Sequence, residues 1–221
     1  MLSRHDLPWI LPFGLFLVLL GVAPLLDLAP RWAEALRWLV VGGAVLLVSR
    51  PVLDLRVSEW AGSIGLGVAV FAVWILPDLL VAGWREGVLF SNGIVGRPES
   101  SFAEGGRGDP LALALRFGRA ALLVPIVEEL FWRGWLPRWV IAPGEAETVP
   151  LGTYTPWVFG ITAVLFASEH GSYWEVGLLA GLAYNWWMQR TRSLGDLVLA
   201  HGVTNACLSA YVVVTGNWQY W

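Results

Sequence analysis

The sequence predicts an all-α fold, a polytopic bundle of about seven to eight transmembrane helices, and three observations support this. Hydrophobic residues make up 57% of the 221 residues, charged residues make up 14%, and the mean hydropathy is +0.62. A soluble domain would carry about 25% charged residues. Several apolar segments approach the roughly 20 residues that cross a bilayer as a helix. We therefore treat residues 1–221 as a single integral membrane domain.

The expected spans follow one another along the chain, separated by links that contain charged residues or proline. The first span lacks a small-residue cleavage site after a short apolar core, so we expect an anchor rather than a cleaved signal peptide. Ser193 with Asp196 three residues later is typical of a helix N-terminus and marks the start of the last span. The expected spans are 7–26, 33–48, 61–81, 111–136, 157–174, 175–189 and 194–215.

Three further features limit what the protein can be. A net charge of −3 gives no indication of a nucleic-acid partner. Cys207 is the only cysteine, so no intramolecular disulfide can form, and a packed thiol is favoured over a nucleophile in this apolar segment. The longest polar segment, residues 83–110, is interpreted as a connector in preference to a substrate lid. Arg116 and Arg119, which follow it, are expected to extend toward the membrane surface.

Two adjacent carboxylates and an arginine lie inside the fourth expected span. Within a bilayer, each of these charges costs several kcal/mol unless it is paired or faces a polar cavity. Glu129 and Arg133 are four residues apart and share one helical face, whereas Glu128 is rotated by about 100°. We therefore expect Arg133 to neutralise Glu129 and to leave Glu128 for chemistry. The alternative is a buried ion cluster with no chemical role.

The remaining polar residues of the spans form two further pairs. His170 follows Phe166 by four residues in the fifth span, and His201 precedes Asn205 by four residues in the seventh. At a rise of about 1.5 Å per residue, Glu128 and His201 lie at similar depths, roughly 10–12 Å from the membrane face that holds the N-terminus. A lone membrane histidine is often only an interhelical hydrogen-bonding group. Polar groups on three spans instead favour a shared site, which we expect to be approached from that face.

The order of these motifs, Glu-Glu-x-x-x-Arg, Phe-x-x-x-His and His-x-x-x-Asn, resembles the CAAX prenyl protease and bacteriocin-processing family. The motifs lie within residues 111–215, which we expect to be the catalytic core. The Trp-rich start and the aromatic end at residues 217–221 also resemble the bacterial subgroup associated with exosortase systems. The matched motif residues are Glu128, Glu129, Arg133, Phe166, His170, His201 and Asn205.

The resemblance implies an intramembrane endopeptidase in the bacterial inner (cytoplasmic) membrane. It would cut near the C-terminus of a prenylated or otherwise membrane-tethered protein, with a glutamate-activated water and no cofactor. By position, Glu128 and His170 would activate water, and His201 and Asn205 would hold the oxyanion. The implied supporting residues are Glu129, Arg133 and Phe166.

Three other functions stay open at this stage. A metal-dependent protease would use Glu128, His170 and His201 as zinc ligands, with water in the fourth position. A non-enzymatic scaffold or bacteriocin-immunity factor could share the fold, although such a protein need not retain all three motifs. A small proton-coupled transporter could use Glu128 and the histidines as a proton relay. In each case the bilayer is a partner, and for a protease the other partner is a membrane-tethered protein or peptide.

Overall fold

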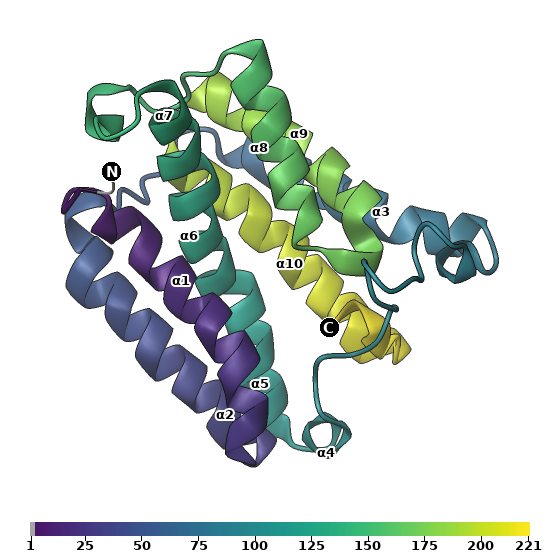
Figure 1. Ribbon diagram of the computed structural model, residues 1–221. Helices are drawn as coiled ribbons and strands as arrows, with labels where there is room; N and C mark the ends of the chain where they lie inside the picture. Colours follow the sequence, from purple (N-terminus) through teal and green to yellow (C-terminus); the bar gives the residue numbers. More distant parts are fainter. Residues whose placement is uncertain (1–2) are drawn as a thin grey trace.

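The computed structural model describes residues 3–221 and confirms the predicted all-helical membrane bundle (Figure 1). Within that range one isolated β-bridge, between Asn92 and Gly96, accompanies the helices. The α-helices are α1 (Leu7–Val22), α2 (Pro30–Arg37), α3 (Trp60–Leu80), α4 (Glu104–Arg107), α5 (Pro110–Gly118), α6 (Val124–Glu129), α7 (Leu136–Ile141), α8 (Pro156–Ser168), α9 (Trp174–Thr191) and α10 (Leu194–Thr215).

Short 3₁₀ and π-helical segments extend or connect these helices. The 3₁₀ segments are η1 (Ala23–Leu26), η4 (Arg50–Val52), η5 (Trp84–Glu86), η8 (Ala146–Thr148), η9 (Gly171–Tyr173) and η10 (Trp218–Tyr220). The π-helical segments are η2 (Trp38–Gly42), η3 (Val45–Ser49), η6 (Arg119–Leu123) and η7 (Leu130–Trp135). The last two flank α6, which carries the paired carboxylates. Single π-turns inside α-helices are frequent at functional sites.

Five continuous helical segments are long and apolar enough to cross a membrane. The two other expected spans correspond to α8, which is apolar but has 13 residues, and to α9, which has 18 residues. The chain ends lie at opposite ends of the bundle (Figure 1). The five segments are Leu7–Leu26, Pro30–Val52, Trp60–Leu80, Pro110–Ile141 and Leu194–Thr215.

The fifth expected span, residues 157–174, is wrong in its second half. The helix α8 ends at Ser168, and His170 lies in the turn that leads into η9. Gly171 has a φ of 53°, a left-handed conformation that glycine adopts without steric cost. The polar run from Ser168 to Ser172 thus ends the helix, and His170 is presented from a turn rather than from a helical face.

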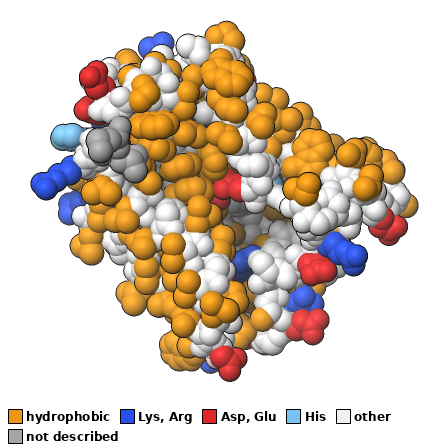
Figure 2. Space-filling view, in the orientation of Figure 1, with side chains coloured by type: hydrophobic (Ala, Val, Ile, Leu, Met, Phe, Trp, Pro, Cys, Tyr) orange, Lys and Arg blue, Asp and Glu red, His pale blue; other side chains and the backbone are white. Residues whose placement is uncertain are grey.

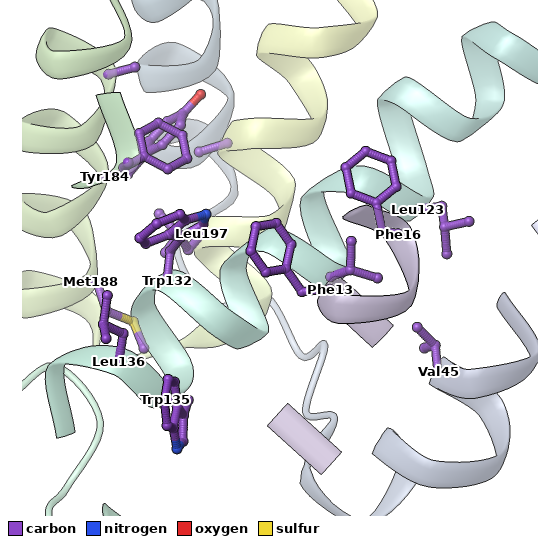
Figure 3. Close-up of a cluster of buried hydrophobic side chains, with 14 of the residues drawn as sticks. Phe13, Phe16, Val45, Leu123, Trp132, Trp135, Leu136, Tyr184, Met188 and Leu197 are labelled. Atoms are coloured by element: carbon purple, nitrogen blue, oxygen red, sulfur yellow. The ribbon is translucent and has the colours of Figure 1, made fainter. Parts of the chain in front are cut away.

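An aromatic core holds α1 against the segment that carries the carboxylates (Figure 3). The rings of Phe13 and Phe131 stack at 4.6 Å between centroids, and Phe13 also meets the edge of Trp132 at 5.7 Å. Trp132 in turn contacts Phe166 of α8 at 5.9 Å. Within a bilayer, such packing stabilises the fold through van der Waals contacts between the rings rather than through the hydrophobic effect. This packing fixes α6 and η7 between α1 and α8.

The helix α10 is fixed at both its start and its middle. Ser193 caps it by accepting the N–H of Asp196 at 3.1 Å, which confirms the predicted N-terminus. The Asp196 carboxylate accepts the backbone N–H groups of Ser58 and Glu59 at 3.0 and 2.7 Å. Near mid-helix, the Thr204 hydroxyl donates to the Gly67 carbonyl of α3 at 2.9 Å.

Candidate active site

One cavity of about 490 Å³ is lined by residues from all three sequence motifs. Figure 2 shows a hollow on this face with an acidic side chain at its upper edge and basic side chains within it and below it. Glu129 and Arg133 do not line the cavity and lie behind it, at 0% and 1% exposure. The motif residues that line it are Glu128 of α6, Phe166 of α8, His170 of the following turn, and His201 and Asn205 of α10.

Glu129 is the centre of a buried hydrogen-bonded triad. Its Oε1 accepts from Arg133 Nη1 at 3.1 Å and from His201 Nδ1 at 2.7 Å. Because the carboxylate accepts at Nδ1, that nitrogen carries a proton and Nε2 is directed elsewhere. The sequence indicated the pairing of Glu129 with Arg133. It gave no sign that Glu129 also orients His201, because these two residues are 72 positions apart.

Glu128 faces the cavity and has no comparable partner. Its Oε2 lies 3.9 Å from His201 Nε2, which is too long for a direct hydrogen bond. Within residues 3–221, no side chain or backbone group donates a hydrogen bond to the Glu128 carboxylate. The carboxylate and the imidazole therefore flank a space where a third polar group can bond to both.

The ring of His170 is held in one tautomer by the backbone of α8. Its Nδ1 lies 2.8 Å from the Phe166 carbonyl oxygen, an acceptor, so Nδ1 carries the proton and Nε2 has the free lone pair. The Phe166 ring packs against the His170 ring at 4.7 Å, and Trp74 of α3 meets it edge-on at 5.2 Å. The four-residue spacing from Phe166 to His170 thus fixes both the position and the tautomer of the histidine.

Arg133 is fixed by contacts from two other helices. Its Nε donates to the Asn185 side-chain oxygen of α9 at 3.1 Å, and its guanidinium carbon lies 4.1 Å from the centre of the Phe166 ring. Asn185 also donates to the carbonyl of Phe159 and to the hydroxyl of Thr162, each at 2.9 Å. The sequence analysis missed Asn185. The position of the Asn185 amide within an otherwise apolar expected span could have indicated a buried hydrogen-bonding role.

Asn205 and Tyr184 complete the wall near His201. The Asn205 side-chain amide donates one hydrogen to the Ala120 carbonyl at 2.9 Å and has a second hydrogen to offer. The Tyr184 ring stacks on His201 at 5.1 Å, and its hydroxyl donates to Thr204 at 2.8 Å. Tyr184 was also missed by the sequence analysis, because a tyrosine in a span is ordinarily a packing residue.

The cavity continues toward the end of the bundle that holds the C-terminus. Its wall there includes Arg97 and Glu99 of the long polar segment, and Tyr220 and Trp221 of the C-terminal end. The segment 83–110 therefore contributes to the cavity wall and does more than connect two helices. The polar lining reaches toward the face opposite the N-terminus, and the expected approach from the face of the N-terminus stays a prediction.

Arg116 and Arg119 also line this part of the cavity, and the expectation that they extend to the membrane surface is wrong. Arg119 is buried, and its Nε donates to Glu34 of α2 at 2.6 Å. Arg116 is largely covered and donates to the Ser101 hydroxyl at 2.8 Å. A carboxylate from a helix distant in sequence thus holds Arg119 inside the protein.

The zinc hypothesis was tested against the arrangement of the side chains. Glu128, His170 and His201 have the donor types that zinc binds in catalytic sites. Within residues 3–221, however, no group of three or more His, Cys, Asp and Glu side chains is arranged to hold a metal ion. The donors are suitable and their spacing in this structure is not that of a preformed metal site.

Comparison with known proteins finds a family resemblance in one part of the chain. Residues 110–207 match the family model of the type II CAAX prenyl endopeptidase Rce1-like proteins, and this interval includes every motif residue described above. Neither the curated proteins nor the solved structures gave a match. The matched interval excludes the Trp-rich start and the aromatic end, so membership of the exosortase-associated subgroup stays a prediction. Residues 110–207 of this chain are thus similar to the Rce1-like type II CAAX prenyl endopeptidases.

Proposed function

We propose that this protein is an intramembrane endopeptidase that hydrolyses a peptide bond near the C-terminus of a membrane-tethered protein, using water activated by Glu128. The observation that supports this most directly is the contrast between the two adjacent carboxylates. Glu129 lies behind the cavity and bonds through Oε1 to Arg133 and His201, whereas Glu128 faces a cavity lined by two histidines and an asparagine. The family match supports a membrane endopeptidase, and the catalytic assignment is our inference from this geometry.

Water activation requires a base beside the attacking oxygen. In the proposed reaction, water bound between Glu128 and His170 attacks the carbonyl carbon and gives its proton to the Glu128 carboxylate. The proton then moves to the leaving amine as the C–N bond breaks. The free Nε2 lone pair of His170 accepts a hydrogen bond from the same water and aligns it. The Phe166 carbonyl maintains the tautomer that this step needs.

Charge developing on the carbonyl oxygen requires donors aimed at it. Asn205 offers the amide hydrogen that Ala120 does not use. His201 donates through Nε2 when this nitrogen carries a proton, and Nε2 lies 3.9 Å from Glu128 Oε2. Preorganised donors of this kind stabilise the transition state because they need no reorientation during the reaction.

The composition and the family match support a membrane setting for the proposed reaction. We place the protein in the bacterial cytoplasmic membrane, with residues 111–215 as the catalytic core and no resident cofactor. The substrate is a protein held in the same membrane by a lipid group or by a span of its own, so its C-terminal region reaches the cavity. Chelator treatment followed by metal analysis of the purified protein tests the zinc-dependent alternative. Persistence of activity in metal-free protein excludes it.

The test of the function is a comparison of protein termini in cells. Terminal peptides from cells that express the wild type are compared by mass spectrometry with those from cells that express Glu128→Gln. Glu145→Gln, the same change at an exposed connector residue, is the matched control. We expect new C-termini in membrane proteins from the wild type and the control, and their absence with Glu128→Gln. Identical termini in all three strains would contradict the proposal and favour the scaffold or transporter functions.

A further inference from the structure

Three arginines surround one carboxylate at the end of the cavity away from Glu128. Glu34 of α2 lies 2.6 Å from Arg119, 2.9 Å from Arg37 and 3.8 Å from Arg116. Its side chain is 2% exposed, so solvent does not screen this cluster. One negative charge faces three positive charges, which leaves an excess of two positive charges inside the protein.

Only part of this cluster reaches the cavity. Arg116 and Arg119 line it, whereas Glu34 and Arg37 lie behind them. Arg119 uses Nε and Nη2 to hold Glu34, at 2.6 and 3.3 Å, and its Nη1 has no recorded partner within residues 3–221. Arg116 bonds to Ser101 through Nη2, and its buried Nε has no hydrogen-bond partner in the described part of the chain. The Nη1 groups of Arg116 and Arg119, which make no hydrogen bond within residues 3–221, can therefore donate to a group in the cavity.

Uncompensated positive charge in a membrane protein is costly unless an anion approaches it. Two neighbouring guanidinium groups match a carboxylate or a phosphate well, because both anions accept paired N–H donors. Two other charged residues line the same end, Arg97 and Glu99. Both are exposed and have opposite charges, so they do not cancel the buried excess.

We propose that Arg116 and Arg119 form an anion subsite that binds the free C-terminal carboxylate of the peptide that enters this cavity. This inference rests on the proposed endopeptidase function. One substrate would bind with its scissile bond at Glu128 and its chain end at the two arginines. Arg119 precedes Glu128 by nine residues in one continuous helical segment, about 13 Å at a rise of about 1.5 Å per residue. An extended peptide covers this distance with about four residues. The subsite thus sets the distance between the scissile bond and the chain end.

A peptide carboxylate fits this location better than a phospholipid headgroup. Both arginines line the wall of the same hollow as Glu128 and His201, and Arg119 is 4% exposed at its side chain. The centres of the Phe102 and Trp221 rings lie 5.9 and 5.7 Å from the Arg116 guanidinium carbon. A lipid phosphate would have to leave the bilayer interface and enter the hollow.

The test measures binding, so it does not depend on catalysis. The full-length Glu128→Gln protein is placed in phosphatidylcholine nanodiscs and titrated with two fluorescent pools of N-palmitoylated heptapeptides of randomised sequence. The pools differ only at the C-terminus, which is a free carboxylate in one and a carboxamide in the other. We expect the carboxylate pool to bind about tenfold more tightly, the effect of a charge-assisted pair of hydrogen bonds. Equal affinity of the two pools would overturn the proposal.

Further variants in the Glu128→Gln protein show which residues cause the preference for the carboxylate pool. Arg116→Gln should bring the two affinities close together, and Arg116→Lys should retain part of the difference because it keeps the charge without the paired donors. Arg31→Gln is the matched control, since Arg31 is on α2 at the same end of the bundle, pairs with Asp109 at 2.8 Å and lies outside the cavity. An equal loss in Arg31→Gln would show a general charge effect and would overturn the subsite.

Two further outcomes distinguish a peptide carboxylate from a lipid phosphate as the bound anion, and the subsite from the endopeptidase function. If anionic phosphatidylglycerol stabilises the protein through Arg116 while the peptide pools bind equally, the subsite takes lipid phosphate and the proposal is wrong. If the carboxylate preference depends on Arg116 but the native chain cleaves no membrane protein, the subsite stands as a peptide-binding site. In that case the proposed endopeptidase function fails.

Discussion

The protein holds two buried charge clusters, and they differ in how the charges are balanced. In the first, Glu129 is bonded to Arg133 and His201, and every member has a defined partner. In the second, Glu34 is the one carboxylate near three arginines, so the cluster has a net positive charge beside the cavity. The balanced cluster fixes geometry because Oε1 of Glu129 holds both Arg133 and His201 Nδ1 in place. An unbalanced cluster remains able to bind an added anion.

Glu128 and Glu34 have different roles, one proposed for catalysis and the other for stability. Glu128 and Glu34 are both buried, at 8% and 1% exposure, but only Glu128 lines the cavity. Glu128→Gln should lower the turnover of the purified enzyme by about 10³-fold or more, with the melting temperature nearly unchanged, because the base is lost and the shape is kept. Near wild-type turnover would show that Glu128 is not the base.

Glu34→Gln should lower the stability of the protein and leave the turnover number nearly unchanged. It removes the one carboxylate among three arginines, so the melting temperature, followed by tryptophan fluorescence in detergent, should fall strongly. Residual folded protein should keep the chemistry at Glu128, and the turnover number per folded molecule should stay within about tenfold of the wild type. A stable Glu34→Gln protein would mean that the arginines are balanced by something other than Glu34.

The arginines provide the next largest contrast. Arg133→Met leaves Glu129 buried without its cation and should cost about 3–5 kcal/mol of unfolding free energy. Arg116→Met removes a charge from the overcharged cluster, where Arg119 and Arg37 still pair with Glu34, and should cost far less. Combining Arg133→Met with Glu129→Gln should restore part of the loss. Failure to recover in that double variant would show that the two residues are not energetic partners.

Asn205→Ala tests the donor proposed for the oxyanion. Loss of one such donor costs about 2.7–4 kcal/mol in the transition state, so kcat should fall by about 10²–10³-fold with little change in KM. Asn217→Ala, at an exposed amide near the C-terminus, is the control. A change confined to KM would mean that Asn205 binds the substrate rather than the developing charge.

The sequence predicted the motif residues of the site better than the partners that hold them. Spacing of four residues indicated the pairing of Glu129 with Arg133, because a helix brings such positions together. The contact of Glu129 with His201 and that of Glu34 with Arg119 join helices 72 and 85 residues apart, and no local pattern encodes them. His170 was misplaced for a related reason, since hydropathy does not show where an apolar helix gives way to a turn.

The smallest effect is expected at Tyr184, where packing and hydrogen bonding can be separated. Its ring stacks on His201 at 5.1 Å, and its hydroxyl donates to Thr204 at 2.8 Å. Tyr184→Phe keeps the ring and removes a single neutral hydrogen bond, while Thr204 still donates to the carbonyl of Gly67. The loss of unfolding free energy should be about 1 kcal/mol.

Turnover by Tyr184→Phe should remain within a few-fold of the wild type, because the triad around Glu129 contains no contact with the Tyr184 hydroxyl. Tyr211→Phe, which removes a more exposed hydroxyl that accepts from Asn217, is the matched control for stability. A turnover loss in Tyr184→Phe comparable to that of Asn205→Ala, with the melting temperature unchanged, would contradict this. It would place the Tyr184 hydroxyl among the groups that act on the substrate.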